Sequence, residues 1–185
     1  MTMRMTRVVL LVLLLIAFYG CKAASQDQEA AVMITRGNRV WSETSKTFKE
    51  WSTEYGNAFA PEHRAKFPAN RASLQASADK ILEILDEEIR LNNEAIQQYE
   101  QAMPLMSNEQ HRKGVGLLVS SQKQTLRGYE IVKSQMQLVS DESIVNAKTF
   151  EEKFLNFGAQ FGRSLRESQA QFEEGSRLLG IELRP

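Results

Sequence analysis

The chain has one cysteine, four prolines and no net charge, and each of these shortages excludes a class of protein. One cysteine cannot form an internal disulfide, so the fold is not a disulfide-stapled scaffold. The 23 basic residues are matched by 23 acidic ones, which argues against nucleic-acid binding because that function usually needs a basic excess. The few prolines leave long stretches in which a helix can continue without interruption. The 185 residues suffice for one domain.

Motifs of common catalytic and cofactor sites are also missing. His63 and His111 are the two histidines, and neither follows a glutamate by three positions, as the di-iron bundles require. A single cysteine excludes haem attachment through Cys-x-x-Cys-His. The sequence has neither a Gly-x-Ser-x-Gly motif nor a phosphate-binding loop. We therefore expect no enzymatic activity, no cofactor, no metal and no nucleic-acid partner.

The first 20 residues differ from all that follow. Arg4 and Arg7 are their only charged residues, and residues 8–19 are apolar without interruption. A helix of that length spans roughly 18 Å, which is well short of a hydrocarbon core of about 30 Å. A short apolar run after a basic start, ending at a small residue such as Gly20, is typical of a secretory signal peptide.

The residues at the end of this run resemble the lipobox of bacterial lipoproteins, in which an aliphatic residue and two small residues precede a cysteine. Gly20 and Cys21 match that pattern, whereas Phe18 and Tyr19 are bulkier than its usual residues. The resemblance covers residues 1–21 only. It implies cleavage before Cys21, diacylglycerol on the cysteine sulfur and an acyl chain, such as palmitate, on the new amino group.

Lipidation of Cys21 would make the protein a cell-envelope lipoprotein anchored to a membrane by several acyl chains. Residue 22 is Lys and not Asp. By the sorting rule of enteric bacteria, the resemblance then implies the periplasmic face of the outer membrane rather than the inner membrane. Two alternatives stay open, namely a plain secretory signal with a chance cysteine and an uncleaved, short anchor.

The pattern of small, polar and apolar residues predicts three segments. Residues 1–20 are the signal peptide, residues 21–30 form a small and polar lipid-anchored tether, and residues 31–185 form the folded domain. Within that domain, apolar residues recur three and four positions apart in four successive runs, which is the period of an amphipathic helix. The runs end at prolines or polar turns, at residues 60–69, near Pro104 and near residues 140–143. We expect Asn70 to cap the second helix, and Ser107 with Gln110 to form a capping box for the third.

These four runs predict an all-α fold, because none of them alternates with the period of a strand. Helices of similar length joined by short connections favour an antiparallel, up-down-up-down four-helix bundle with long helices. The alternative is one or two helical hairpins that complete their cores by dimerising, which would make the protein a homo-oligomer.

Several polar residues occupy positions in the apolar stripes. The sequence predicts a polar core layer made by Thr44, Glu88, Asn92, Gln122 and Ser168. A buried polar group without a hydrogen bond lowers the free energy of unfolding by about 1–3 kcal/mol. We therefore expect a polar layer in the core to serve a purpose in structure or in binding. One purpose is to fix the register of the helices, as polar core residues do in coiled coils. The other is to line a small-ligand pocket between helices near Thr44 and Gln122.

The expected topology brings two apolar segments to the lipid-bearing end of the bundle. They contain Met103, Leu105, Met106, Leu178, Leu179, Ile181 and Leu183. These residues either cap the core or form a membrane-proximal patch that contacts lipid or a protein partner. Our interpretation is a membrane-anchored lipoprotein that acts as a structural or protein-interaction module with an unknown protein partner. The alternative is a small-ligand carrier or sensor.

Overall fold

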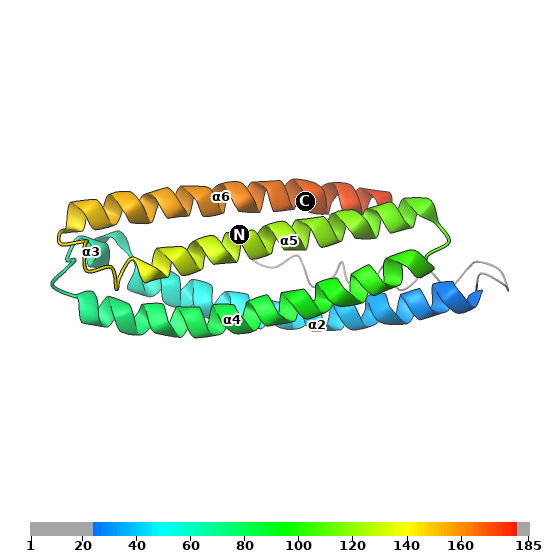
Figure 1. The fold of residues 1–185 in the computed structure, drawn as a ribbon, viewed down its shortest axis with the longest axis horizontal. Coiled ribbons are helices and arrows are strands. Elements are labelled where there is room, and N and C mark those ends of the chain that lie inside the picture. Colours follow the sequence, from blue (N-terminus) through cyan, green and yellow to red (C-terminus); the bar gives the residue numbers. More distant parts are fainter. Residues whose placement is uncertain (1–23, 181–185) are drawn as a thin grey trace. The chain divides into compact units, whose positions relative to one another are not determined.

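The computed structural model describes residues 24–180, and all regular structure in that range is helical (Figure 1). The all-α prediction is thereby confirmed. The four long helices are α2 (Ala24–Ala58), α4 (Arg71–Ala102), α5 (Glu109–Gln137) and α6 (Ala147–Leu178). A short helix, α3 (Pro61–Arg64), follows α2, and a 3-10 turn, η3 (Met103–Leu105), follows α4. The predicted signal peptide and Cys21 lie outside the described residues.

The helix ends differ in detail from those expected. Residues 24–30, which the sequence predicted as a tether, are helical. The side chain of Asn108, and not that of Ser107, caps α5 by accepting a hydrogen bond from the backbone amide of His111 at 3.0 Å. Ser107 instead donates its amide and its hydroxyl to the carboxylate of Asp27. Asn70 precedes α4, but its side-chain amide donates to the carbonyl of His63. Short polar residues bond equally well to local and distant partners, so sequence spacing alone does not select the cap.

The helices contribute to two compact units. Unit 1 contains the described residues up to Glu43, the range Leu91–Gln124 and the described residues from Arg166 onward. Unit 2 contains Thr44–Arg90 and Thr125–Leu165. Each unit therefore takes one segment from each of the four long helices, and each segment presents one apolar face to its unit.

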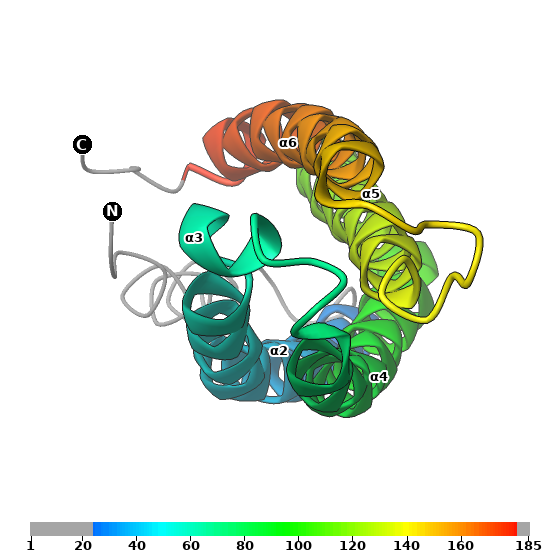
Figure 2. The same cartoon turned by 90° about the vertical axis from the view of Figure 1, so that its left-hand side faces the viewer.

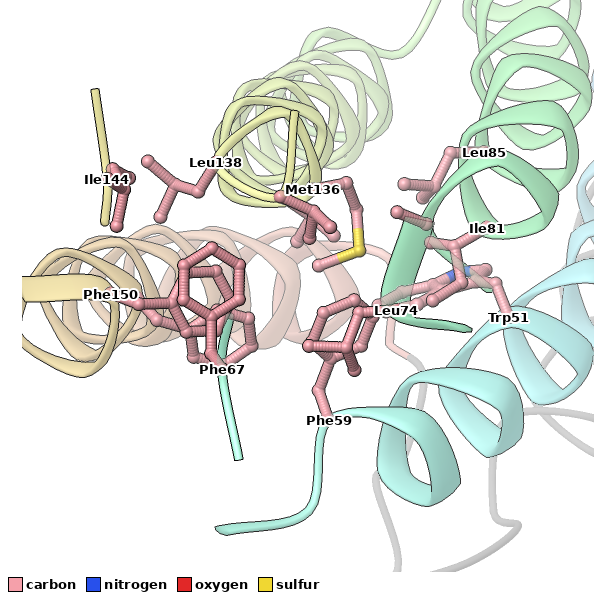
Figure 3. Close-up of a cluster of buried hydrophobic side chains, with 14 of the residues drawn as sticks. Trp51, Phe59, Phe67, Leu74, Ile81, Leu85, Met136, Leu138, Ile144 and Phe150 are labelled. Carbon is pink, nitrogen blue, oxygen red and sulfur yellow. The ribbon is translucent and has the colours of Figure 1, made fainter. Parts of the chain in front are cut away.

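Unit 2 has an aromatic core. Phe67 stacks on Phe150 with ring centroids 4.2 Å apart, and the two rings overlap in Figure 3. Phe59 stacks on Phe154 at 5.3 Å, which joins the end of α2 to α6. Figure 2 looks onto this end of the unit, where α3 lies beside α2. Phe67 follows α3 and is 3% exposed, so the proline-containing loop contributes to the core.

Helices α5 and α6 approach each other closely in both units. In unit 1, a Cβ atom added to Gly175 would lie 2.9 Å from the backbone oxygen of Gly114. In unit 2, a Cβ atom on Gly128 would lie 3.1 Å from the ring of Phe161. Gly114 and Gly128 are separated along α5 by a multiple of seven residues, and so are their contact partners Gly175 and Phe161 along α6. Gly114, Gly128 and Gly175 thus allow the two helices to pack closely.

Candidate functional site

A buried carboxylate is the most unusual feature of unit 2. Glu88 lies on α4 and is 1% exposed, while Ile81 and Leu85 on the same helix are fully buried. These three residues are spaced four and three apart, so Glu88 occupies a core position of the helix. Ionised side chains are almost never fully buried unless they are bonded to other groups. Glu88 therefore needs a specific environment.

The Glu88 carboxylate accepts hydrogen bonds from α2 and α5. The indole nitrogen of Trp51 donates to Oε2 at 2.8 Å, and the phenol of Tyr129 donates to Oε1 at 2.7 Å. The rings of Trp51 and Tyr129 meet edge to face, with centroids 6.1 Å apart. The glutamate and two aromatic residues from three helices thus form one group, which we call the Glu88 cluster.

Burial raises the pKa of both titratable residues in the Glu88 cluster. Loss of water around the carboxyl raises the pKa of Glu88 to about 7, against the opposing effect of hydrogen bonds from Tyr129, Trp51 and Thr47. Burial also raises the pKa of the Tyr129 phenol well above 10, and the Glu88 carboxylate adds to this rise. Near neutral pH, Glu88 therefore exchanges a proton while Tyr129 keeps its own.

A second polar contact in unit 2 ties the loop after α2 to α6. The guanidinium of Arg64 donates to both carboxylate oxygens of Glu151, at 2.7 and 2.8 Å, and also to the carbonyl of Phe59. The same guanidinium lies 4.8 Å from the centroid of the Phe154 ring. The hydrogen bond and charge of Arg64 lower the pKa of Glu151. This contact holds α3 and the loop in place.

Unit 1 has its own polar group. The phenol of Tyr99 donates to Asn38 Oδ1 at 2.6 Å and also bonds to the side chain of Gln122. Gly37 makes room for the ring, because a Cβ atom there would lie 2.8 Å from Tyr99 Cε1. The nitrogen Nδ2 of Asn38 and the oxygen Oε1 of Gln122 are buried without a hydrogen-bond partner. We call these three residues, Asn38, Tyr99 and Gln122, the Tyr99 cluster.

The five residues expected in a polar core layer are all buried in the structure. Thr44 and Glu88 belong to unit 2, whereas Asn92, Gln122 and Ser168 belong to unit 1. Ser168 exchanges hydrogen bonds with Ser121 across α5 and α6, each hydroxyl donating to the other residue's carbonyl. Gln122 lies in the Tyr99 cluster and Glu88 in the Glu88 cluster, so the structure assigns these two residues to different polar groups.

The apolar residues expected at the lipid-bearing end are at least half-buried where the structure describes them. Met106 and Leu179 are buried, and Met103, Leu105 and Leu178 are half-buried. Leu179 packs against α5, because a Cβ atom on Gly114 would lie 2.8 Å from its Cγ atom. Ile181 and Leu183 lie outside the described residues. The described members of the set thus pack within unit 1.

Sequence reasoning missed the partners of the buried polar groups. Trp51, Tyr99 and Tyr129 lie within the runs of regularly spaced apolar residues, and Arg64 lies in the proline-containing segment between two runs, so nothing local marks them as partners of buried polar groups. A signal was present for the Glu88 cluster, since a glutamate at a core position needs donors and Trp and Tyr carry both a large apolar ring and a polar group. The sequence does not show which of the six tyrosine and tryptophan residues supplies them.

Other features of the described chain are less distinctive. Between residues 24 and 180, no group of three or more His, Cys, Asp or Glu residues is placed to hold a metal ion. In the same range, no helix has both the length and the apolar character needed to cross a membrane. A depression of about 260 Å³ lies on α2, lined by Gln28, Ala31, Val32, Thr35 and Arg36. All of these lining residues belong to one helix, so the depression is not an inter-helix pocket near Thr44 and Gln122.

Comparison with known proteins gave no match to any protein-family model, to any curated protein or to any solved structure.

Proposed function

We propose that this protein is a cell-envelope lipoprotein, anchored by lipid on Cys21, whose helical domain acts as a structural or protein-interaction module. The observation that carries the proposal is the position of Cys21, which follows the apolar run of residues 8–19 and Gly20 and lies three residues before α2 begins. On this proposal the mature chain is held at the periplasmic face of the outer membrane, has no enzymatic activity and presents its helices to a protein partner.

We further propose that the four long helices form an antiparallel, up-down-up-down bundle. Contacts within each unit support this arrangement. In unit 1, Gly114 and Ser121 on α5 pair with Gly175 and Ser168 on α6, so rising numbers on one helix meet falling numbers on the other. In unit 2, Trp51 on α2 pairs with Glu88 on α4, and Glu54 on α2 pairs with Lys80 on α4. The residue numbers rise along α2 while those of their partners fall along α4, so these two helices are also antiparallel.

The packing inside unit 2 supports a module that binds its partner through surface residues. The core of unit 2 is filled by stacked aromatic rings, and most of its large side chains are buried. The buried side chain of Gln135 accepts from the half-buried Tyr55 phenol at 3.1 Å and donates to the carbonyl of Phe154 at 2.7 Å. A domain packed in this way binds partners on exposed faces and loops.

Membrane association of the wild-type chain and of Cys21→Ser in Gram-negative cells tests the lipid anchor. We expect the wild-type chain to fractionate with the outer membrane and to carry the added mass of a diacylglycerol and an acyl chain. Cys21→Ser should lose both. A control with Cys21→Ser and Ala23→Cys keeps a cysteine near the site but moves it, and it should remain unlipidated. Equal membrane association and unmodified mass for all three chains would refute the anchor.

The position after the cysteine gives a separate test of location. Lys22→Asp should shift the protein toward the inner-membrane fraction if the enteric sorting rule applies, whereas Lys22→Ser should not. Crosslinking in intact envelopes, followed by mass spectrometry, then identifies the partner. Recovery of no crosslinked protein from cells in which the anchor is correctly processed would argue against an interaction module.

A small-ligand carrier is the second candidate, and the Tyr99 cluster is the observation that favours it. Asn38 Nδ2 is a buried donor and Gln122 Oε1 a buried acceptor, and both side chains bond to the Tyr99 hydroxyl. A small neutral molecule with one acceptor and one donor would satisfy both atoms. Native mass spectrometry of the purified chain, compared with Gln122→Leu, would reveal such a molecule as added mass in the wild-type chain alone.

A further inference from the structure

Both protonation states of Glu88 fit the hydrogen bonds that surround it. The indole nitrogen of Trp51 is only a donor, so its bond to Oε2 requires an unprotonated oxygen there. The hydroxyl of Tyr129 is both a donor and an acceptor. When Oε1 carries a proton, the carboxyl group donates to the Tyr129 oxygen, and the bond keeps its place with its direction reversed. The contact between Glu88 and Tyr129 is thus kept in both states, while the hydroxyl hydrogen of Tyr129 turns away from Oε1 in the protonated one.

The groups that pack against Glu88 are mostly aromatic rings and hydroxyls, whose protonation does not change near neutral pH. Tyr129, from α5, is a titratable residue bonded to it, and burial keeps its phenol protonated near neutral pH. From α2 come the indole of Trp51 and the hydroxyl of Thr47. Helix α6 contributes the ring of Phe161, whose centroid lies 6.3 Å from that of Trp51. The nearby charged side chains on α4 and α5 form surface ion pairs, Lys133 with Asp86 and Arg90 with Glu87.

We propose that Glu88 is a proton-binding site inside unit 2 and that its proton makes the packing of α2, α4 and α5 respond to pH. With the proton bound, the carboxyl group is neutral and is well accommodated among Ile81, Leu85 and the aromatic rings. When the proton leaves, a charge remains in an apolar core, and unit 2 becomes easier to open.

The sign of the effect follows from the two states of the chain. The pKa of Glu88 is about 7 in the folded protein and close to the ordinary value of 4.5 in the unfolded chain. The contribution of Glu88 to stability is therefore fully present below about pH 4.5 and falls as the pH rises toward 7. It is lost above that value. The folding equilibrium constant should decrease roughly 300-fold across this window on account of this residue alone.

Urea unfolding of the purified full chain between pH 5 and pH 8 tests the proposal. We expect the wild-type folding equilibrium to weaken as the pH rises, and Glu88→Gln to remove most of that dependence. The amide of glutamine imitates the protonated acid, since it accepts from Trp51 and donates to Tyr129. The matched control is Glu87→Gln, because Glu87 is adjacent on the exposed face and its pKa is lowered by Arg90. This control should keep the wild-type dependence above pH 5.

Two measurements on folded chains that keep Glu88 cover the case in which Glu88→Gln does not fold. The carboxyl carbon of Glu88, followed by NMR, should titrate with a midpoint near 7, and the fluorescence of Trp51 in a Trp41→Phe background should change with the same midpoint. A Glu88 midpoint below 5 would overturn the proposal. So would a wild-type stability that does not change between pH 5 and pH 8, or a folded Glu88→Gln that keeps the slope of Glu87→Gln.

Discussion

Ser121 on α5 and Ser168 on α6 hold their helices together by two reciprocal hydrogen bonds. Each hydroxyl donates to the carbonyl of the other residue, at 2.8 and 2.9 Å, and the two hydroxyl oxygens lie 3.0 Å apart. Such bonds form only where two backbones come very close. Gly114 and Gly175, seven residues away along each helix, allow this approach because neither has a Cβ atom.

Gly175→Ala should destabilise the protein by about 1–3 kcal/mol, because the new Cβ atom would lie 2.9 Å from the backbone oxygen of Gly114 and a backbone atom cannot move aside cheaply. Gly56→Ala is the control, since nothing lies within 4 Å of a Cβ atom there. It should stabilise α2 by about 0.5–1 kcal/mol through helix propensity. Urea unfolding of the two variants measures both effects, and equal effects would contradict the close approach of α5 and α6.

Arg64→Lys should loosen the loop after α2. Lysine keeps the charge but cannot donate to both oxygens of Glu151 and to the carbonyl of Phe59 at once. We expect a loss of about 1–3 kcal/mol and faster amide exchange in residues 60–69. Arg90→Lys is the matched control, because Arg90 makes the same two-pronged contact with Glu87 on an exposed surface. It should change stability by less than about 0.5 kcal/mol.

Tyr129→Phe should raise the pKa of Glu88 further, because the hydrogen bond from the phenol favours the charged carboxylate. The loss of stability with rising pH should then begin at the same pH, near the ordinary value of 4.5, but continue to a higher pH than in the wild-type chain. NMR titration of the Glu88 carboxyl carbon gives the midpoint directly. Tyr99→Phe changes a buried phenol in unit 1 and should leave this midpoint where it is. A lowered midpoint in Tyr129→Phe would mean that the phenol does not donate to Glu88.

Tyr99→Phe should itself cost about 1–2 kcal/mol, because the oxygen of Asn38 would lose the donor that lies 2.6 Å away. Asn38→Leu combined with Tyr99→Phe should cost less than the two separate losses together, since the double variant leaves no buried acceptor from this pair. Thermal unfolding of the four chains measures the coupling. Strict additivity would show that the two side chains do not act as a pair.

The sequence predicted the presence and approximate extent of the long helices, because their apolar stripes persist over many turns and proline ends the runs. It was less successful at helix ends. Ser107 and Asn108 are both good capping residues, and the choice between them depended on Asp27, which lies far away in the chain. Residues 24–30 are small and polar, yet they are helical.

Local pattern by itself predicted part of the core, since the three- and four-residue spacing places Thr44 and Gln122 on the same faces as their apolar neighbours, and both are buried. The lipid anchor stays a prediction from the N-terminal sequence, and it depends on Cys21 and on the short apolar run before it. Tertiary structure decided what each buried polar group bonds to. Trp51 and Tyr129 are distant in sequence from each other and from Glu88, and only the packing of three helices makes them its donors. The raised pKa of Glu88 has the same origin, because burial is a property of the folded unit and not of any one helix.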